Sequence, residues 1–190
     1  MKEILLIGGG GHCRSVIDVI EQEGKYIIVG IIDKKELLGT EVLGYKVIGY
    51  DDDLEKLFMK YKNAIITIGQ ISSAVIRIKL FNKLKNIGYN LPTIISPLAY
   101  VSNHSEIEEG TIIMHHALVN SNVSIGKNCI INTKALIEHD VTIKDNCHIS
   151  TASVVNGGVT IEKETFFGSN ATSKEYITVN GFIKANSLTK

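Results

Sequence analysis

The sequence predicts an α/β N-terminal domain with a small Rossmann-like parallel sheet, followed by a left-handed parallel β-helix. Two observations predict this arrangement. Apolar side chains recur at every sixth position from Ile95 to Phe167, and a solenoid with three short strands per turn requires that period. Residues 1–90 lack the period and alternate strand-like with helix-like segments instead. We therefore expect two domains, over residues 1–92 and 93–190.

The N-terminal domain is expected to alternate strands and helices, which favours a parallel sheet. The expected strands cover residues 2–7, 26–32 and 64–68, and the expected helices cover 12–23, 52–60 and 72–87. A short hairpin-like stretch surrounds Gly44. Pro92 and Pro97 flank the passage into the second domain.

The second domain shows two columns of inward-facing side chains. The first is aliphatic or aromatic throughout: Ile95, Val101, Ile107, Ile113, Val119, Ile125, Ile131, Ile137, Ile143, Ile149, Val155, Ile161 and Phe167. The second column starts at Ala99 and contains only small or β-branched residues. Three hexapeptides make one turn, and residues one turn apart should stack about 4.8 Å from each other. Cys147 should therefore lie beside Cys129. The phase of the pattern slips after Phe167, so we expect a bulge or loop near 169–176.

Composition argues against several classes of protein. The 20 Lys and Arg residues balance 20 Asp and Glu residues with no long run of either sign, so no nucleic-acid partner is expected. No apolar run approaches the roughly 20 residues of a spanning helix, and no signal peptide is evident, so we expect a cytoplasmic protein without a membrane segment. The 3 cysteines include no CxxC pair, so neither a disulfide framework nor a zinc site is expected.

A glycine-rich turn follows the first expected strand and leads into a helix. Gly8, Gly10, Gly11 and His12 form this turn, which lets a phosphate approach the backbone at a helix N-terminus. A dinucleotide fingerprint would require a glycine where Cys13 stands. The turn therefore fits a mononucleotide or nucleotide sugar better than NAD, and a structural turn without a ligand is the alternative.

Three further residues are expected at the same edge of the sheet. Asp33 ends the second strand, where a carboxylate can bind a ribose or a base edge. Gly69 and Gln70 follow the third strand. Ligands bind beyond the carboxyl ends of strands in open α/β sheets, so these residues are candidate substrate contacts.

The densest polar cluster of the coil is Glu138, His139 and Asp140, at a corner between inward-facing residues. A histidine held by a carboxylate is a general base suited to neutral pH. Gly157 lies one turn above His139, where its N–H could donate to a carbonyl oxygen that develops negative charge. Taken alone, an exposed corner histidine without function is the simpler interpretation.

The remaining histidines of the coil do not converge within one chain. His148 is half a turn from His139, so the two rings should face nearly opposite directions. They could share a site only if a neighbouring chain supplied one of them, which favours an oligomer. His104, His115 and His116 are also dispersed, so no metal site is expected.

These motifs together resemble the NeuD/PglD family of sugar acetyltransferases. The resemblance runs over essentially the whole chain and rests, in order, on Gly8–His12, Ile68–Gln70, Ile131–Thr133, Ile137–Asp140, Ile149–Thr151 and Val155–Gly158. It implies a homotrimer of left-handed β-helices that transfers an acetyl group from acetyl-CoA to a bacterial surface-glycan sugar.

The resemblance also implies roles for individual residues. His139 would deprotonate the acceptor, Asp140 would orient it, and Asn132 and His148 would line the site. The N–H of Gly157 would hold the thioester carbonyl of acetyl-CoA. Attack on the thioester would be direct, without an acetyl-enzyme.

The same resemblance assigns the glycine-rich turn and Asp33 to the nucleotide part of the substrate. The leading hypothesis is therefore N-acetylation of a nucleotide-linked amino sugar. O-acetylation of sialic acid or CMP-sialic acid is the alternative, because the stretches around Gly69 and Ser150 look closer to that branch. A noncatalytic trimeric scaffold or sugar sensor is a third hypothesis, raised by the absence of a Gly-x-Pro-Ala-Lys-like tail after the last coil.

Overall fold

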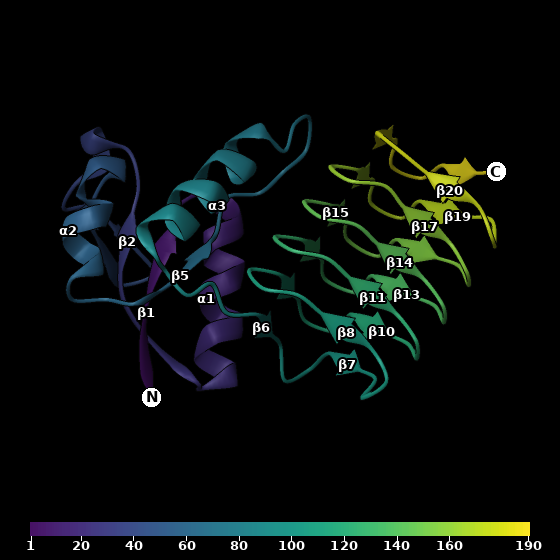
Figure 1. Cartoon of the computed structure of the whole chain (residues 1–190), viewed down its shortest axis with the longest axis horizontal. Coiled ribbons are helices and arrows are strands. Elements are labelled where there is room, and N and C mark those ends of the chain that lie inside the picture. The colour runs from purple at the N-terminus through teal and green to yellow at the C-terminus, as the bar shows by residue number, and fades with distance from the viewer. The chain divides into compact units, whose positions relative to one another are not determined.

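The computed structural model describes all 190 residues and divides them into two compact units. The first unit contains residues 1–69 and 77–92, and the second contains residues 70–76 and 93–190. The segment 70–76 therefore belongs with the coil, although the α/β unit contains the sequence on both sides of it. Figure 1 shows the helices and sheet of the first unit and the stacked strands of the second.

The first unit is a five-stranded sheet in the order β3-β4-β2-β1-β5. Its elements are β1 (Lys2–Ile7), α1 (Gly11–Glu23), β2 (Tyr26–Ile32), a 3-10 turn (Lys35–Leu37), β3 (Glu41–Val42), β4 (Tyr45–Gly49), a 3-10 turn (Asp51–Asp53), α2 (Leu54–Phe58), β5 (Asn63–Ile66) and α3 (Val75–Ile87). The pairs β1·β2, β1·β5 and β2·β4 are parallel, and β3 pairs antiparallel with β4 across the hairpin at Gly44. The predicted α/β class and parallel sheet are confirmed.

Two predicted helices begin later than expected, and side chains near their starts explain the later start. The carboxylate of Asp53 accepts a hydrogen bond from the Tyr50 N–H at 3.1 Å, which holds residues 51–53 in a 3-10 turn before α2 begins. The hydroxyl of Ser73 accepts a hydrogen bond from the Val75 N–H at 3.2 Å. Short polar side chains compete for backbone groups in this way at helix starts, so α3 begins at Val75.

The second unit is a coil of parallel two-residue strands on three faces, as the six-residue period predicts. The first face contains β7 (Tyr100–Val101), β10 (Leu118–Val119), β13 (Leu136–Ile137), β16 (Val154–Val155), β19 (Thr172–Ser173) and β22 (Leu188–Thr189). The second contains β8 (Glu106–Ile107), β11 (Ser124–Ile125), β14 (Thr142–Ile143), β17 (Thr160–Ile161) and β20 (Thr178–Val179). The third contains β6 (Ile94–Ile95), β9 (Ile112–Ile113), β12 (Ile130–Ile131), β15 (His148–Ile149), β18 (Phe166–Phe167) and β21 (Phe182–Ile183).

From Gly110 onward, each corner of the coil turns through a residue in the left-handed backbone region. We call the corner after the first face the first corner, and the corners after the second and third faces the second and third corners. Along the first corner, Asn122, Asp140, Gly158 and Tyr176 have φ of 58°, 62°, 69° and 54°. Asn, Asp and Gly tolerate this region far better than a bulky residue does, so Tyr176 is the unusual member of its column.

The axis of the coil is filled by the two predicted columns. Ile131, Ile137, Ile149 and Phe167 are fully buried there. The predicted stacking of two cysteines is confirmed, because the Cys147 N–H lies 3.4 Å from the Cys129 sulfur. Burial of this apolar axis is the main source of stability for such a stack.

The expected irregularity at residues 169–176 is wrong in position. The period continues through Ser173 and Val179, both buried in the first column, and the true irregularity is at Asn180–Gly181. There β21 follows β20 after only these two residues. The slip in the apolar pattern arises because Ser173 occupies an inward position, where its hydroxyl accepts a hydrogen bond from the Asn156 N–H at 2.9 Å.

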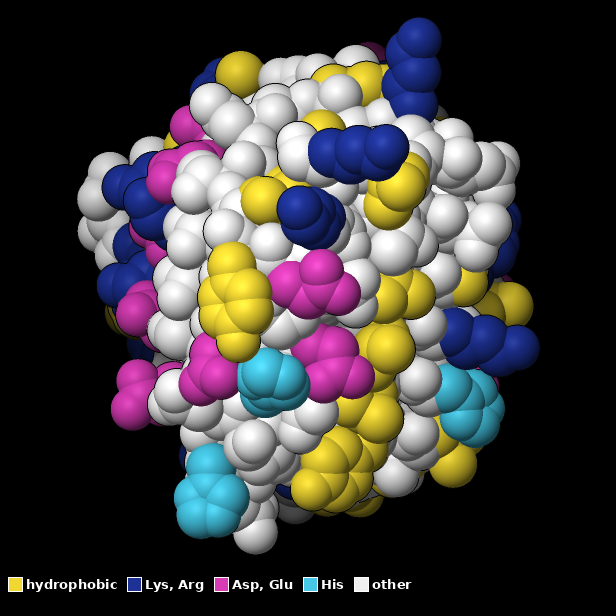
Figure 2. All heavy atoms as spheres, turned by 90° about the vertical axis from the view of Figure 1, so that its right-hand side faces the viewer, with side chains coloured by type: hydrophobic (Ala, Val, Ile, Leu, Met, Phe, Trp, Pro, Cys, Tyr) yellow, Lys and Arg dark blue, Asp and Glu magenta, His cyan; other side chains and the backbone are white.

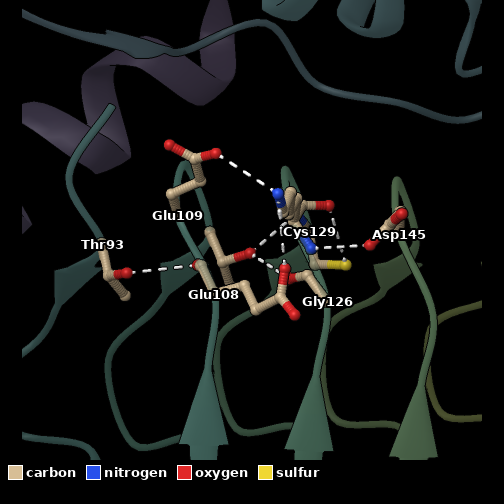
Figure 3. A network of polar contacts seen from close by, with 8 residues as sticks. Thr93, Glu108, Glu109, Gly126, Cys129 and Asp145 are labelled. Carbon is tan, nitrogen blue, oxygen red and sulfur yellow. Dashed lines mark hydrogen bonds and ion pairs between the residues drawn. The ribbon is translucent and has the colours of Figure 1, made fainter. Parts of the chain in front are cut away.

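Polar side chains link successive turns along the second corner (Figure 3). The Asp145 carboxylate accepts a hydrogen bond from the Lys127 N–H at 3.0 Å, and the Thr93 hydroxyl donates to the Glu108 carbonyl at 3.2 Å. A β-carbon on Gly126 would lie 2.4 Å from a carboxylate oxygen of Asp145, so only glycine fits there. These contacts are structural.

No helix in the structure has the length and apolar character needed to cross a bilayer.

Candidate active site

The structure places the predicted site residues in three separate groups. The first group is His139, Asp140 and Gly157 on the first corner of the coil. The second group, also in the coil unit, is Gln70, Asn132 and His148. The third group lies in the α/β unit and consists of Gly8, Gly10, Gly11, His12, Asp33 and Gly69.

His139 is held by the carboxylate next to it. Its Nδ1 lies 2.8 Å from Oδ2 of Asp140, and the side chain of Asn122 donates to Oδ1 of Asp140 at 2.6 Å. Asp140 is an acceptor, so Nδ1 carries the proton and Nε2 presents its lone pair. Nε2 makes no hydrogen bond within the chain, which leaves it available as a base.

The electrostatics of this pair follow from those contacts. The hydrogen bond from His139 to Asp140 raises the pKa of the imidazole above its ordinary 6.5, and the negative charges of Asp140 and Glu138 act in the same direction. The hydrogen bonds from Asn122 and His139 lower the pKa of the Asp140 carboxyl. Asp140 is therefore ionised at neutral pH, and His139 is a stronger base than a free histidine.

Glu138 and Asn120 fix the backbone of the same corner. The Glu138 carboxylate accepts a hydrogen bond from the Asn120 side chain at 2.9 Å and one from the His139 N–H at 3.3 Å. Because Asn120 is one turn below Glu138, these bonds tie two turns together at the histidine. The His139 side chain is itself half exposed, at 50%.

Gly157 and Gly158 allow aromatic rings to lie close to their backbone. The ring of His139 comes from the turn below, and that of Tyr176 comes from the turn above. A β-carbon on Gly157 would lie 2.8 Å from Cε1 and 2.9 Å from Nε2 of His139. A β-carbon on Gly158 would lie 2.3 Å from Cδ1 of Tyr176. The N–H of Gly157 makes no hydrogen bond within the chain, so an oxygen bound beside the imidazole could accept from it.

Histidine, acidic and apolar side chains lie next to one another on the face of the molecule shown in Figure 2. In the structure, His139, Asp140 and Gly157 supply a base, its carboxylate partner and an unpaired N–H donor at the first corner of the coil. That set can remove a proton from an acceptor and stabilise negative charge on a carbonyl oxygen.

A methyl group at Gly157 tests this geometry. Gly157→Ala should lower kcat by about 10–100-fold, because displacing a catalytic group by about 1 Å has an effect of that size. The backbone φ of Gly157 is not positive, so the melting temperature should stay close to that of the wild type. Steady-state kinetics and thermal unfolding measure the two quantities, and an unchanged kcat would mean that the imidazole position does not matter.

The second group is organised around a buried histidine. His148 is 6% exposed, and its Nδ1 lies 2.5 Å from the carbonyl oxygen of Gln70. A carbonyl only accepts, so Nδ1 carries the proton and Nε2 accepts from the Asn132 side-chain amide, 3.0 Å away. Both ring nitrogens are therefore occupied. His148 does not contact the His139 corner of its own chain; the two histidines lie on different parts of the coil, as predicted.

Gln70 connects its own segment to the coil. Its side-chain amide donates to the carbonyl oxygen of Asn146 at 3.0 Å, while its backbone oxygen contacts His148. Gln70 is 2% exposed. Gln70 is therefore a buried support of His148. Its role as a substrate contact stays a prediction.

The third group gathers at the carboxyl ends of β1, β2 and β5. Asp33 accepts a hydrogen bond from the Gly9 N–H at 2.6 Å, and the Thr67 hydroxyl donates to the Gly8 carbonyl at 2.5 Å. Gly8 has φ of 104° and packs against Ile68. These bonds shape the turn from inside.

The outer part of the same turn is open. Gly10 and Gly11 are exposed, and a β-carbon at either would meet nothing within 4 Å. Gly10 is the N-cap of α1, no side chain caps the helix, and its first turn contains no acidic residue. The free N–H groups and the helix dipole favour an anion at this position.

Sequence reasoning missed two contributors to these groups. Tyr176 packs over Gly158. The sequence pattern that could have indicated this contact is an aromatic residue one turn after a corner glycine. Arg77 is buried and donates to the carbonyl oxygens of Ile66 at 3.2 Å and Ile68 at 2.6 Å, at the end of β5. No periodic or motif signal marks Arg77, because it stands among ordinary polar positions of a helix.

No cluster of three His, Cys, Asp or Glu side chains in the structure could hold a metal ion. Cys13, Cys129 and Cys147 are buried, free thiols. Burial raises the pKa of the Cys13 thiol, and the hydrogen bond with Cys129 raises that of Cys147. None of the three lies at the His139 corner.

Comparison with known proteins points to one kind of enzyme. Residues 3–84 match the family model of the PglD N-terminal domain. A solved structure of a perosamine N-acetyltransferase from Caulobacter crescentus, a mutant with a histidine replaced by asparagine in complex with CoA and GDP-perosamine, is 28% identical with a TM-score of 0.92. The match covers 100% of this chain and 89% of that one.

Two further structures match as well. The acetyltransferase domain of PglB from Neisseria gonorrhoeae is 26% identical, with a TM-score of 0.92 over 100% of this chain and 92% of that one. The same domain in complex with acetyl coenzyme A is 27% identical, with a TM-score of 0.89 over 97% and 88% of the two chains. No curated protein sequence matches the chain.

Proposed function

We propose that this chain, which is similar to NeuD/PglD sugar acetyltransferases, uses acetyl-CoA to N-acetylate a nucleotide-linked amino sugar of a bacterial surface glycan. The relatives with solved structures support the donor, because they are acetyltransferases with CoA or acetyl-CoA bound. They also support the acceptor class, because one of them holds GDP-perosamine. Residues 1–92 would bind the nucleotide sugar, and residues 93–190 would carry out the transfer.

The observation that carries this proposal is the arrangement of His139, Asp140 and Asn122. Their hydrogen bonds of 2.8 and 2.6 Å leave Nε2 of His139 as the one unoccupied ring nitrogen. In the proposed reaction the amine nitrogen of the sugar attacks the thioester carbonyl carbon and gives its proton to Nε2. The C–S bond breaks, CoA leaves as the thiolate, and the proton that Nε2 took from the amine passes to the thiolate sulfur.

Gly157 would stabilise the oxygen that gains charge during this attack. Its N–H has no partner within the chain, and the glycine itself lies beside the imidazole. A preorganised backbone donor of this kind acts on charge that develops in the transition state. The buried thiols support direct transfer, because no cysteine stands at the corner to form an acetyl-enzyme.

Asn132 and His148 would complete the site from a second chain. Within one chain these residues lie away from His139, so a joint role requires an oligomer, and we propose a homotrimer. In that site Asn132 would contact the acceptor sugar. His148 would lie at the acetyl-CoA side and would hold the Asn132 amide through the hydrogen bond at 3.0 Å.

The glycine-rich turn would hold the nucleotide part of the substrate. The uncapped N-terminus of α1, at Gly10, Gly11 and His12, would receive a phosphate. Asp33 would bind the ribose or base edge, and Gly69 lies against the His12 side chain at the same strand ends.

The deciding experiment is the release of CoA thiol from acetyl-CoA with four kinds of acceptor in parallel. UDP-4-amino-sugars and GDP-perosamine represent the proposal, and sialic acid and CMP-sialic acid represent O-acetylation. We expect turnover with the amino-sugar nucleotides alone. Turnover confined to the sialic acids would replace N-acetylation by O-acetylation, and silence with every acceptor from a folded protein would favour a scaffold or sugar sensor.

The pH dependence of kcat/KM reports the base. Neutral His139 is the active form, so kcat/KM should rise with pH through a pKa above 6.5, which Asp140 raises by its hydrogen bond. In Asp140→Asn the rise should move to lower pH, and the plateau should fall by about 10–10³-fold because the ring loses the partner that fixes its tautomer.

Both enzymes should be titrated with the same acceptor, so that ionisation of its amine contributes equally to the two profiles. An unchanged inflection in the variant would show that His139 is not the titrating base.

Asp33→Ala tests the nucleotide site. A nucleoside diphosphate should raise the melting temperature of the wild type, and the variant should bind it about tenfold or more weakly, as expected for loss of a charged hydrogen-bond partner. Asp52→Ala, which removes an exposed carboxylate elsewhere in the same unit, serves as the matched control. Equal stabilisation of all three proteins would place the nucleotide elsewhere.

A further inference from the structure

The packing of the coil does not explain why a tyrosine occupies position 176. Its side chain is 76% exposed, and its φ of 54° lies in the left-handed region that bulky side chains avoid. Asparagine is the most frequent residue at this type of position, as Asn122, Asn128, Asn146, Asn170 and Asn186, whereas His116, Lys134, Asp140, Ala152 and Glu164 occupy other corners. An exposed aromatic ring on an unfavourable backbone contributes little to folding, which directs attention to what the ring touches.

The ring lies on the backbone of Gly158. A β-carbon there would be 2.3 Å from Cδ1 and 2.4 Å from Cε1, so the ring covers the glycine directly. The Tyr176 N–H donates to the Gly157 carbonyl at 3.0 Å, which fixes the two turns against each other. Gly157 and Gly158 thus form a strip of bare backbone with the imidazole of His139 over one residue and the phenol of Tyr176 over the next.

We propose that Tyr176 limits the length of the acyl group that the enzyme transfers. This inference rests on the proposed function. In that function the thioester carbonyl binds the Gly157 N–H, and the base and the acceptor amine approach it from the side of His139. The acyl chain then extends along the bare strip toward the next turn, where the Tyr176 ring stands. A methyl group fits against the apolar ring, and a chain longer by one or two methylenes meets it.

The variant Tyr176→Asn tests the proposal without disturbing the fold, because asparagine is the common residue at such corners. The measurement is kcat/KM for acetyl-, propionyl- and butyryl-CoA with one acceptor. In the wild type acetyl-CoA should be preferred. In Tyr176→Asn the ratio of butyryl to acetyl transfer should rise about tenfold or more, the range expected for one or two methylenes in a pocket.

Two controls accompany the variant. Tyr176→Phe keeps the ring and should keep the wild-type ratio, which separates the ring from the hydroxyl. Tyr100→Asn removes another tyrosine, 60% exposed on the first face, and should also leave the ratio unchanged. A ratio in Tyr176→Asn equal to that of the wild type, with normal acetyl transfer, would overturn this inference alone.

Binding separates this inference from the proposed function. Isothermal titration with acetyl-CoA and butyryl-CoA needs no acceptor, and Tyr176→Asn should tighten butyryl-CoA binding relative to acetyl-CoA. Parallel affinities in wild type and variant would overturn the role of Tyr176. Failure of the wild type to bind any CoA thioester would overturn the proposed function, and this inference with it.

Discussion

His139→Ala is expected to lower kcat by about 10²–10⁴-fold, the usual contribution of a positioned general base. Without the imidazole, the first corner loses its unoccupied basic nitrogen, and the carboxylates of Asp140 and Glu138 are already engaged by Asn122 and Asn120. KM for acetyl-CoA should change little, because the Gly157 N–H remains. Steady-state kinetics with a saturating acceptor measures both constants.

The fold should tolerate this change. The His139 side chain is 50% exposed, so the free energy of unfolding should stay within about 0.5 kcal/mol of the wild type. His116→Asn, an exposed histidine at a third-corner position that suits asparagine, is the matched control and should retain full kcat. A His139→Ala enzyme with undiminished kcat would remove the corner from the mechanism.

Phe167→Ala is expected to destabilise the protein by about 3–5 kcal/mol, the range for truncating a buried aromatic side chain. Phe167 is fully buried in the axis of the coil, between Ile149 on one turn and Ile183 on the next. Its removal leaves a cavity that the rigid stack cannot close. Urea unfolding followed by circular dichroism would measure the change.

Phe182→Ala is the matched control for this prediction. Phe182 lies in the adjacent strand of the same face, but its side chain points outward and is 56% exposed. The Phe182→Ala variant should lose no more than about 1 kcal/mol of unfolding free energy. Equal losses for the two variants would contradict the view that the inward column stabilises the coil.

The sequence predicted the coil because its period is enforced by geometry. Inward positions such as Ile131, Ile137 and Ile149 must be apolar on every turn, so each turn repeats the evidence. The position of the irregularity was missed for a physical reason. Ser173 is polar yet buried, because its hydroxyl is paired with the Asn156 N–H, and the pattern could not distinguish it from a break.

The site was predictable where function and spacing coincide. His139, Asp140 and Gly157 share a corner because residues one turn apart must stack, and the hydrogen bond from His139 to Asp140 followed from adjacency. The burial of Gln70 was not predictable, because its segment packs on the coil far away in sequence. The same holds for Tyr176, whose importance depends on where its ring lies rather than on its spacing.

The short corner at Asn180–Gly181 bears on how such a chain can change its length. Although this corner is short, Phe182 still pairs with Phe166 and Leu188 still pairs with Thr172. Corners therefore absorb insertions and deletions, whereas a single residue added within a strand would turn inward side chains outward. Foreign peptides or tags are best accommodated at corners away from His139, and gain or loss of a whole turn would keep every column aligned.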